Sequence, residues 1–468
     1  MEPGTVSSMN GLTGNISTRS AGWAVVCVAQ FVVVLDATIV TTALPAIGAD
    51  LGFAAATLPW VFMAYTIVLA GLLVLGGRTA DLGGARRIFR IGLVVFSAAS
   101  LVCALAWSPA VLIGARVAQG AGAALLSPAA LAALSDALPP EATRRALGWW
   151  TAAGAGGGAS GWFLGGLITQ VAGWRWVFAV NVPIGFVALL WSVRSLPGRG
   201  SRTHVATLDL PGACCVTAGI ALTAVGLSEI ARDASAWPGW AALTTAALLL
   251  IGFTRIERRS QQPLLPPSLL RTHGVLGGNL TAAALTASTS PAMLTAALYV
   301  QDTLRLPPAL AGLIFPVFNI AVIGGSMLGP PAVRALGVRR ALLTGFTGVA
   351  VGVAVLLHLP AEGLPLTLLI SGFGVMGVSL GVASVASTTA GTAYVRETDR
   401  GVAAGVLNSS AQLGASLGLA LSGPVIASAA PMTGYRMAFG LGISVALTGL
   451  AAAFTVPRTV RRSADSLG

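Results

Sequence analysis

The sequence predicts an all-α membrane protein with fourteen transmembrane helices, and three observations indicate this fold class. First, 55% of the 468 residues are hydrophobic, only 9% are charged and the mean hydropathy is +0.84. A water-soluble domain of this length needs more charge to cover its surface. Second, the apolar runs are about 20 residues long, enough to cross a bilayer as a helix. Third, they lack the polar and apolar alternation of membrane β-strands. The backbone N–H and C=O groups must therefore form their hydrogen bonds within helices.

Fourteen apolar segments follow one another along the chain, and short loops join them. Helices adjacent in sequence are therefore expected to run antiparallel across the membrane. The predicted segments are residues 22–47, 58–77, 88–107, 110–137, 146–170, 175–194, 208–230, 237–254, 273–300, 308–332, 340–359, 363–392, 401–427 and 435–456.

The composition excludes several kinds of chemistry. All 27 basic residues are arginine, and the sequence contains no lysine. A Walker A phosphate loop and a pyridoxal Schiff base both need lysine, so active transport by this chain is expected to use an ion gradient. The three histidines are scattered, and the four cysteines lie in apolar runs without ligand spacing. We therefore expect no cofactor, no metal site and no enzymatic activity.

The arginines are unevenly distributed between the two sides of the predicted membrane. With the N-terminus in the cytoplasm, 22 of the 27 fall on the inner side, four on outer loops or helix ends, and Arg116 within a segment. Basic residues accumulate on the cytoplasmic side, so we expect a bacterial inner-membrane protein with both termini in the cytoplasm. The net charge of +12 then reflects topology and indicates no nucleic-acid partner. Residues 1–21 show no cleavable signal peptide and are expected to be a disordered cytoplasmic segment, and residues 458–468 a cytoplasmic tail.

The chain also contains an internal repeat with an offset of about 252 residues. The stretch Gly84–Arg87 has a counterpart at Gly337–Arg340, and Gly120–Gly122 has one at Gly372–Gly374. Transporters are commonly built from such repeats, and chance similarity among glycine-rich helices is the alternative. The repeat predicts an N-terminal six-helix bundle at 22–196, a linker with two extra transmembrane helices at 197–257, and a C-terminal six-helix bundle at 258–457.

Five motifs, in order on the predicted helices, carry a family resemblance. They are LDATIVTTALP at Leu35–Pro45, GRTADLGGARR at Gly77–Arg87, RVAQGAG at Arg116–Gly122, WRWVFAVNVPIG at Trp174–Gly185 and ERRSQQPLL at Glu257–Leu265. With these motifs, residues 22–457 resemble the fourteen-helix drug:proton antiporters of the major facilitator superfamily. The resemblance implies the major facilitator fold and proton-driven export of a drug or antibiotic.

Asp36 and Arg116 are the two charged residues that lie clearly inside apolar segments. A charge within a spanning helix costs roughly 2.5–3.5 kcal/mol on insertion scales, so such residues are rare and usually functional. Both are expected in the outer half of the membrane, within reach of each other. We predict that Asp36 carries the proton and that Arg116 modulates it, and a fixed ion pair that only orders two helices is the alternative. The repeat places Leu368 at the position equivalent to Arg116, so the architecture does not require this charge.

After segment 2 we predict a cytoplasmic gate formed by Gly77, Asp81, Arg86 and Arg87. The carboxylate and the two guanidinium groups can form a charge latch that opens as the two halves of the transporter rock. The family motif has basic residues at positions 82 and 85, which are leucine and alanine in this chain. A basic cluster that only sets the membrane topology is the alternative.

Segment 5 contains glycines at four-residue spacing, Gly157, Gly161 and Gly165, which form a smooth face for close approach of another helix. They are predicted to be conformational glycines, because the family's antiporter motif lies in this segment. Trp162 stands where that motif normally has proline. It is predicted to line the cavity and stack on an aromatic substrate, and a tryptophan that faces lipid or another helix is the alternative.

The single firm intramembrane carboxylate also restricts the substrate. A cation in a dry cavity needs acidic partners, so a neutral or weakly charged substrate is expected, although Arg116 could meet an anionic group. For the polar candidates, hydrogen bonding between helices is the alternative role. The residues predicted to bind substrate are Phe31, Met63, Tyr65, Gln119, Trp162, Asn279, Phe315, Asn319, Met376, Asn408 and Gln412.

The predicted function is proton-coupled antiport that exports small organic molecules by alternating access. We expect a monomer whose partners are its substrate, protons and the lipid bilayer. The composition is typical of a high-GC bacterium, in which similar proteins often export an antibiotic that the host makes. A proton-coupled uptake symporter is the alternative, because it could use Asp36 in the same way. A receptor or a membrane-embedded enzyme is a third class, but the sequence supplies no nucleophile, metal site or sensor domain for it.

Overall fold

The computed structural model describes residues 7–54, 56–137, 140–196, 209–233, 235–259, 274–393, 395 and 400–457, and within these ranges it contains helices and no strand. The helices of the first half are α1 (Ser7–Leu51), α2 (Trp60–Gly83), α3 (Ala85–Ala104), α4 (Pro109–Ala137), α5 (Pro140–Val171), α6 (Arg175–Ala179) and α7 (Asn181–Ser195). Two further helices, α8 (Leu210–Arg232) and α9 (Trp237–Arg259), precede the second half. That half comprises α11 (Val275–Leu298) with a π-helical turn (Tyr299–Thr303), α12 (Pro308–Ile314), α13 (Pro316–Leu336), α14 (Val338–Leu356), α15 (Leu366–Thr392), α16 (Arg400–Ala427), α17 (Pro431–Ala452) and a 3-10 turn (Ala453–Thr455).

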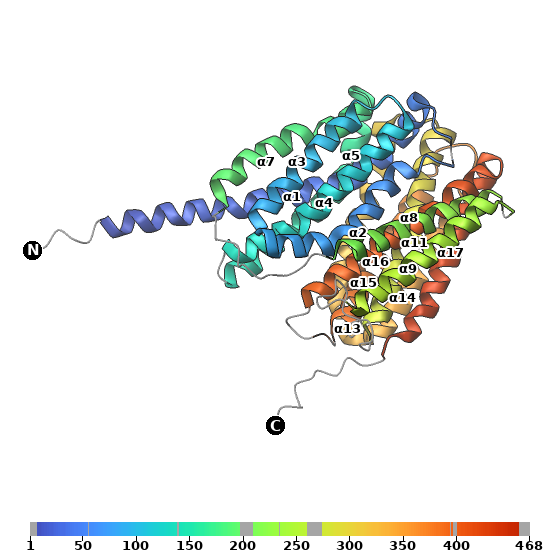
Figure 1. The fold of residues 1–468 in the computed structure, drawn as a ribbon. Coiled ribbons are helices and arrows are strands. Elements are labelled where there is room, and N and C mark those ends of the chain that lie inside the picture. The colour runs from blue at the N-terminus through green and yellow to red at the C-terminus, as the bar shows by residue number, and fades with distance from the viewer. Residues whose placement is uncertain are drawn as a thin grey trace, which may run out of the picture.

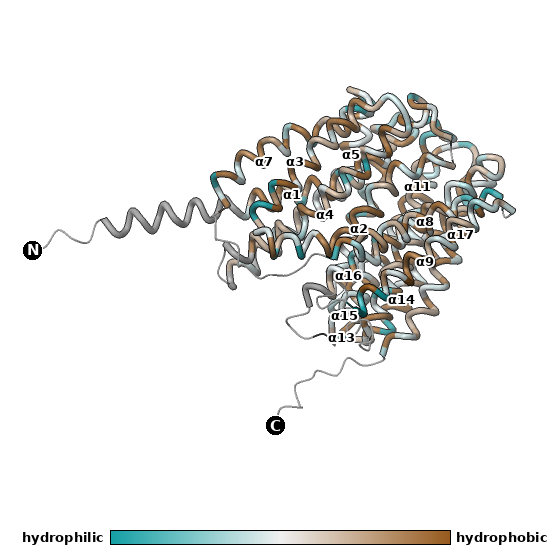
Figure 2. The backbone as a smooth tube through the Cα atoms, in the orientation of Figure 1, coloured by the Kyte–Doolittle hydropathy of each residue, from teal (hydrophilic) through white to brown (hydrophobic). Residues whose placement is uncertain are grey.

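The length and hydrophobicity of these helices confirm the predicted fold class. Thirteen helical stretches in the described residues are long and apolar enough to cross a membrane. The helix α5 covers the one remaining predicted segment, residues 146–170. Figure 2 shows hydrophobic residues along most of the helices and hydrophilic residues gathered near helix ends and loops. A helix with apolar residues on most of its surface is stable in lipid, where its backbone bonds are satisfied internally.

Two predicted segments are each divided into two helices. Residues 175–194 form α6 and α7, which are separated at Val180, and residues 308–332 form α12 and α13, which are separated at Phe315. Pro183 and Pro316 lie just after these breaks. Proline has no backbone N–H to donate to the carbonyl four residues earlier and its ring clashes with that carbonyl, so the preceding helix ends there.

The helix α1 extends further toward the N-terminus than the apolar pattern predicts. It begins at Ser7, so residues 7–21, which were expected to be disordered, are helical in the structure. Extending an existing helix is much less costly than nucleating one, and residues 7–44 contain no proline. The predicted tail at 458–468 lies outside the described residues.

The two sets of helices pack in the same pattern. In the first set α1 packs on α5, while α2 and α3 both pack on α4; in the second set α11 packs on α16, while α13 and α14 both pack on α15. Figure 1 shows the blue to green helices on one side of the molecule and the yellow to red helices on the other. We call these sets the N-terminal bundle (α1–α7) and the C-terminal bundle (α11–α17).

The inserted helices α8 and α9 lie beside the junction of the two bundles. The helix α8 packs on α2 of one bundle and on α16 of the other, and α9 packs mainly on α8. The N-terminus of α8 is capped by Asp209, whose Oδ1 accepts from the Gly212 amide at 2.8 Å. Before α9, the hydroxyl and the amide of Ser235 both donate to Asp233, and these hydrogen bonds lower the pKa of that carboxyl.

Candidate functional site

The charged residues of segments 1 and 4 meet in the interior of the N-terminal bundle. Asp36 on α1 and Arg116 on α4 form an ion pair between Oδ2 and Nη1, and both side chains are fully buried. Asn181, at the start of α7, donates from Nδ2 to the other carboxylate oxygen at 2.7 Å. Gln119 on α4 donates from Nε2 to that same oxygen at 2.8 Å. The carboxylate is therefore held by one guanidinium and two amide groups.

The Gln119 amide connects this ion pair to α3. Its Oε1 accepts from Arg116 Nη1 at 2.7 Å, and its Nε2 also donates to Ser100 Oγ at 2.8 Å. Cys103 Sγ lies 3.7 Å from the same Oε1. Residues three apart share a face of a helix, which is why α4 presents Arg116 and Gln119 together. We call Asp36, Arg116, Gln119, Asn181 and Ser100 the polar cluster.

Further contacts favour a charged Arg116 in this buried position. Its Nε donates to the Val61 carbonyl of α2 at 2.8 Å. The guanidinium carbon lies 4.4 Å from the Tyr65 ring centre and 5.7 Å from that of Phe178, within range of cation–π attraction. Among the described residues, Arg116 Nη2 and Asn181 Oδ1 are buried without a hydrogen-bond partner. Because Arg116 of α4 bonds to α2 and Asn181 belongs to α7, a change of charge on the carboxylate will alter contacts of α2, α4 and α7.

Four residues predicted from the sequence meet at this cluster, namely Asp36, Arg116, Gln119 and Tyr65. The last two were predicted to bind substrate, whereas the structure places them against the ion pair. Sequence reasoning misses Asn181, although this residue belongs to a motif that carries the family resemblance. The available signal was a lone amide side chain just inside an apolar segment, a position that needs a hydrogen-bond partner.

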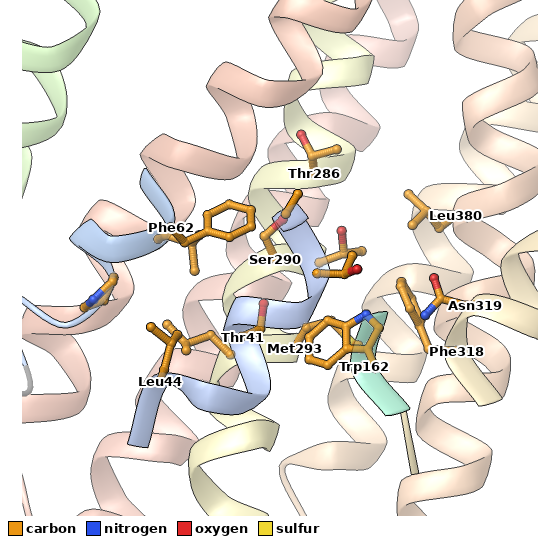
Figure 3. A pocket seen from close by; sticks show the side chains of 16 residues that line it. Thr41, Leu44, Phe62, Trp162, Thr286, Ser290, Met293, Phe318, Asn319 and Leu380 are labelled. Carbon is orange, nitrogen blue, oxygen red and sulfur yellow. The ribbon is translucent and has the colours of Figure 1, made fainter. Parts of the chain in front are cut away.

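A cavity of about 220 Å³ lies between the two bundles. Figure 3 shows side chains from both bundles around it. Thr38 and Thr41 come from α1, Trp162 from α5, Ser290 from α11 and Asn319 from α13. Neither here nor elsewhere in the described ranges do three His, Cys, Asp or Glu residues lie close enough together to hold a metal ion.

The structure brings only some of the predicted substrate-binding residues to this cavity. Trp162 and Asn319 line it. Phe315 lies next to Trp162, with ring centres 4.5 Å apart in a stacked arrangement. Met63 and Met376 are fully buried in the cores of their bundles.

The other predicted substrate-binding residues also lie outside the cavity wall. Phe31 packs against the core of the N-terminal bundle. Asn279 holds α11 to α16, because its Oδ1 accepts from Ser410 at 2.8 Å while its Nδ2 donates to its own helix. Asn408 is exposed and Gln412 is partly exposed on α16. For Asn279, the alternative of a hydrogen bond between helices describes the observed contact.

The cavity and the polar cluster lie on different faces of α1. Ala37, Thr38, Thr41 and Leu44 line the cavity at helical spacing. Asp36 does not line it, and its carboxylate bonds to α4 and α7. At about 100° per residue, Asp36 is about 140° around the helix from Thr41. The helix α1 therefore joins two sites that share no side chain.

The three glycines predicted on α5 all lie against α1. Gly157 faces the Phe31 carbonyl, Gly161 faces Thr38, and Gly165 faces the next turn of α1. Thr38 Oγ1 lies 3.4 Å from the Gly157 carbonyl oxygen, to which it donates. A β-carbon at any of these glycines would require α1 or its side chains to move, so the glycines permit close approach of the two helices.

The predicted gate residues gather near the turn between α2 and α3. Arg86 donates from Nη2 to the Val193 carbonyl in the last turn of α7 at 3.2 Å, where a cation is favourable. Asp81 and Arg87 are exposed. Gly77 lies opposite Pro128 of α4. The charge latch between these side chains stays a prediction.

Comparison with known protein families identifies the family of this chain. The family model of the Major Facilitator Superfamily matches residues 26–264 and 276–467. The chain belongs to this superfamily. This major facilitator protein is therefore a membrane transporter and not an enzyme.

Curated relatives of this major facilitator protein cover most of its length. It is 38% identical over 432 residues to a cephamycin export protein of Amycolatopsis lactamdurans, covering 89% of this chain and 86% of the relative. It is 34% identical over 446 residues to a puromycin resistance protein of Streptomyces alboniger, covering 93% and 87%. It is 30% identical over 411 residues to a tetracenomycin C resistance and export protein of Streptomyces glaucescens, covering 86% and 75%.

Solved structures share the fold at low sequence identity. The POT family transporter PepTSo superimposes with a TM-score of 0.67 at 13% identity, covering 94% of this chain and 98% of that one. An inward-facing, unoccupied bacterial homologue of the lysosomal transporter Spinster gives 0.65 at 16% identity, covering 93% and 96%. These likenesses agree with the two-bundle architecture.

Proposed function

We propose that this chain exports small organic molecules across the bacterial inner membrane in exchange for protons, as a monomer with both termini in the cytoplasm. The observation that carries the proposal is the buried Asp36–Arg116 ion pair. A carboxylate and a guanidinium are costly inside a membrane, so they are rare there and usually serve a function. The three curated relatives described above, which are export or resistance proteins, support the direction of transport.

In this mechanism Asp36 is the proton carrier. While it is ionised, its carboxylate pairs with Arg116 and accepts from Gln119 and Asn181. A proton on Oδ2 removes the charge that holds Arg116 Nη1, but Arg116 still donates to the Val61 carbonyl of α2. Protonation therefore loosens the link from α1 to α4 while the link from α4 to α2 remains.

The helix α1 can transmit this change to the cavity, because the cavity wall and the proton carrier occupy two faces of the same helix. The smooth glycine face of α5 allows α1 to shift or rotate against it. Gln301 donates to the Thr42 carbonyl at 3.2 Å, and the Ala309 amide donates to Gln170 at 3.1 Å. With both termini in the cytoplasm, these bonds between the two bundles lie on the outer side and close it. In the outward-open state, the charge latch after α2 closes the inner side instead.

The test is drug susceptibility of a pump-deficient bacterium that expresses this chain, across a panel of antibiotics. The wild type should protect against some compounds, and Asp36→Asn at equal expression should return susceptibility to that of the host. Asp50→Asn is the matched control, because Asp50 lies on the same helix but pairs with Arg175 at a site where both side chains are nearly half exposed. Protection that survives Asp36→Asn would exclude this residue as the proton carrier.

Inverted membrane vesicles separate export from uptake. An exporter driven by protons accumulates substrate when the vesicle lumen is acidified, because the lumen corresponds to the outside of the cell. An uptake symporter does not accumulate substrate under this gradient. Accumulation only with an alkaline lumen would overturn the proposed direction.

A further inference from the structure

The chemistry of the cavity wall restricts what the cavity can hold. Within the described part of the chain, none of the residues that line the cavity is charged. The nearest buried carboxylate, Asp36, is turned toward α4 and α7 and is occupied by three donors. An ionised ligand would therefore lose its hydration without gaining a counter-charge, which costs far more than burying a neutral polar group.

Among the described residues, three polar groups on the wall have no hydrogen-bond partner. Asn319 Nδ2 is buried and makes no hydrogen bond in the described part of the chain. Among the described residues, Thr41 and Ser290 also show no side-chain hydrogen bond, whereas Thr38 and Thr289 donate to backbone carbonyls. Buried polar groups are nearly always satisfied, which applies to Asn319 Nδ2 and to the buried residue Thr41, while Ser290 is partly buried. These groups on α1, α11 and α13 are suited to bind a ligand that offers an acceptor to the amide and hydroxyl or carbonyl groups to the others.

The rest of the wall is aromatic or aliphatic. Trp162 lines the cavity, and Phe315, which does not, stacks against it at 4.5 Å between ring centres. Phe373 packs on Phe315 with 5.4 Å between ring centres. The Trp162 indole is therefore held in place by two further aromatic rings. Phe318 also lines the cavity (Figure 3). Fixed aromatic side chains of this kind favour flat ring systems, which stack with an offset or meet an aromatic edge.

We infer that the cavity takes an uncharged molecule that combines a flat aromatic ring system with a carbonyl oxygen and at least one hydroxyl group. The carbonyl accepts from the Asn319 amide, the hydroxyl group pairs with Thr41 or Ser290, and the rings pack on Trp162. This inference rests on the proposed function only in taking the cavity as the site of the transported molecule.

Three probes that share one ring system test the inference. They are 2-(hydroxymethyl)anthraquinone, which is neutral, anthraquinone-2-carboxylate, an anion, and 2-(aminomethyl)anthraquinone, a cation at pH 7. Equilibrium dialysis against the full chain in lipid nanodiscs, with empty nanodiscs to subtract partitioning into lipid, measures each Kd. The neutral probe should bind, and each charged probe should bind at least about tenfold more weakly. Equal affinities, tighter binding of a charged probe, or binding of none of the three would overturn the inference.

Matched variants locate the binding site of the neutral probe. Asn319→Leu and the double change Thr41→Val with Ser290→Ala should each weaken it about three- to tenfold, because each leaves a polar group of the ligand unpaired. Ser288→Ala is the control on the same helix, since Ser288 donates to the Leu285 carbonyl and does not line the cavity. Trp162→Leu should weaken binding about threefold or more. If these variants bind as the wild type does, or if Ser288→Ala weakens binding as much as they do, the assignment is wrong.

The two proposals can fail separately. If the predicted binding pattern holds but the wild type moves no compound, only the export function fails. If the wild type exports charged compounds and binds the charged probes as tightly as the neutral one, only the substrate class fails.

Discussion

The two bundles repeat the same helix packing but differ in what they bury. The N-terminal bundle buries a connected set of charged and amide side chains around Asp36 and Arg116. At the offset of about 252 residues, the C-terminal bundle has Ser288 in place of the carboxylate and Leu368 in place of the guanidinium. Ser288 is buried and, among the described residues, its side chain bonds only to the Leu285 carbonyl of its own helix. One architecture thus supports an ionic interior and an uncharged one.

The comparison of the two bundles separates features that the fold requires from features that serve the proposed function. The helix pairs that pack in both bundles are maintained by small residues and apolar surfaces, and no charge is needed for them. The C-terminal bundle contains a group of rings, among them Phe315, Phe318 and Phe373. The ion pair is therefore an addition to one half of a repeat. Because charges inside a membrane are costly and usually functional, we propose that this pair serves transport.

The largest effect is expected from removing the guanidinium. Arg116→Met leaves the Asp36 carboxylate buried without a counter-charge, which should lower the free energy of unfolding by about 3–5 kcal/mol. The equivalent change in the other bundle, Leu368→Met, keeps size and polarity and should cost less than about 1.5 kcal/mol. Unfolding in mixed detergent micelles, followed by circular dichroism, measures both variants.

A double variant identifies the cause of that loss. Asp36→Asn combined with Arg116→Met removes both charges, so it should be more stable than Arg116→Met alone. If the double variant is the less stable of the two, lost packing around the arginine stem explains the effect rather than an unpaired charge. The contrast between an ionic and an uncharged bundle would then have no effect on stability.

The fold and the ion pair could be predicted from the sequence because each depends on the free-energy cost of placing polar groups in lipid. This cost can be estimated from the order of the residues alone. The number of helices follows from the length of the apolar runs, and Asp36 and Arg116 stand out as charges within them. The cavity wall could not be predicted in this way. A polar residue in an apolar helix is known to be buried, but its direction depends on how the helix is rotated in the bundle. Tyr65 and Gln119 thus face the ion pair, while Thr41 and Ser290 face the cavity.

A smaller effect should separate two glycines that occupy equivalent positions in the repeat. A β-carbon on Gly122 would lie 2.6 Å from the Phe96 amide nitrogen of α3, whereas one on Gly374 would meet no atom within 4 Å. Gly122→Ala should therefore cost about 1–3 kcal/mol through overpacking. Gly374→Ala should be neutral or stabilise by up to about 1 kcal/mol, because alanine favours a helix. The same unfolding measurement compares them, and equal losses would show that the repeat packs alike at this position in both bundles.

The smallest effect concerns a hydroxyl pair between bundles and one within a bundle. Thr66 on α2 and Ser416 on α16 have their hydroxyl oxygens 2.7 Å apart, across the junction of the two bundles. Thr281 on α11 and Ser387 on α15 lie 3.0 Å apart inside the C-terminal bundle. Hydrogen bonds between membrane helices contribute about 0.6 kcal/mol on average. Both pairs suit a double-mutant cycle with Thr→Val and Ser→Ala changes.

The two cycles should differ in what they change. If the bundles rock against each other, the Thr66–Ser416 pair breaks in one state, so its loss should alter the transport rate by about threefold or less, the factor that 0.6 kcal/mol allows. The Thr281–Ser387 pair stays intact within a bundle that moves as a unit, so its loss should change stability by a similar energy and leave the rate unchanged. Transport rates in proteoliposomes and unfolding curves measure both. A rate effect of the same size from the pair within the bundle would mean that the C-terminal bundle deforms during transport, and that its uncharged interior takes part as the ionic one does.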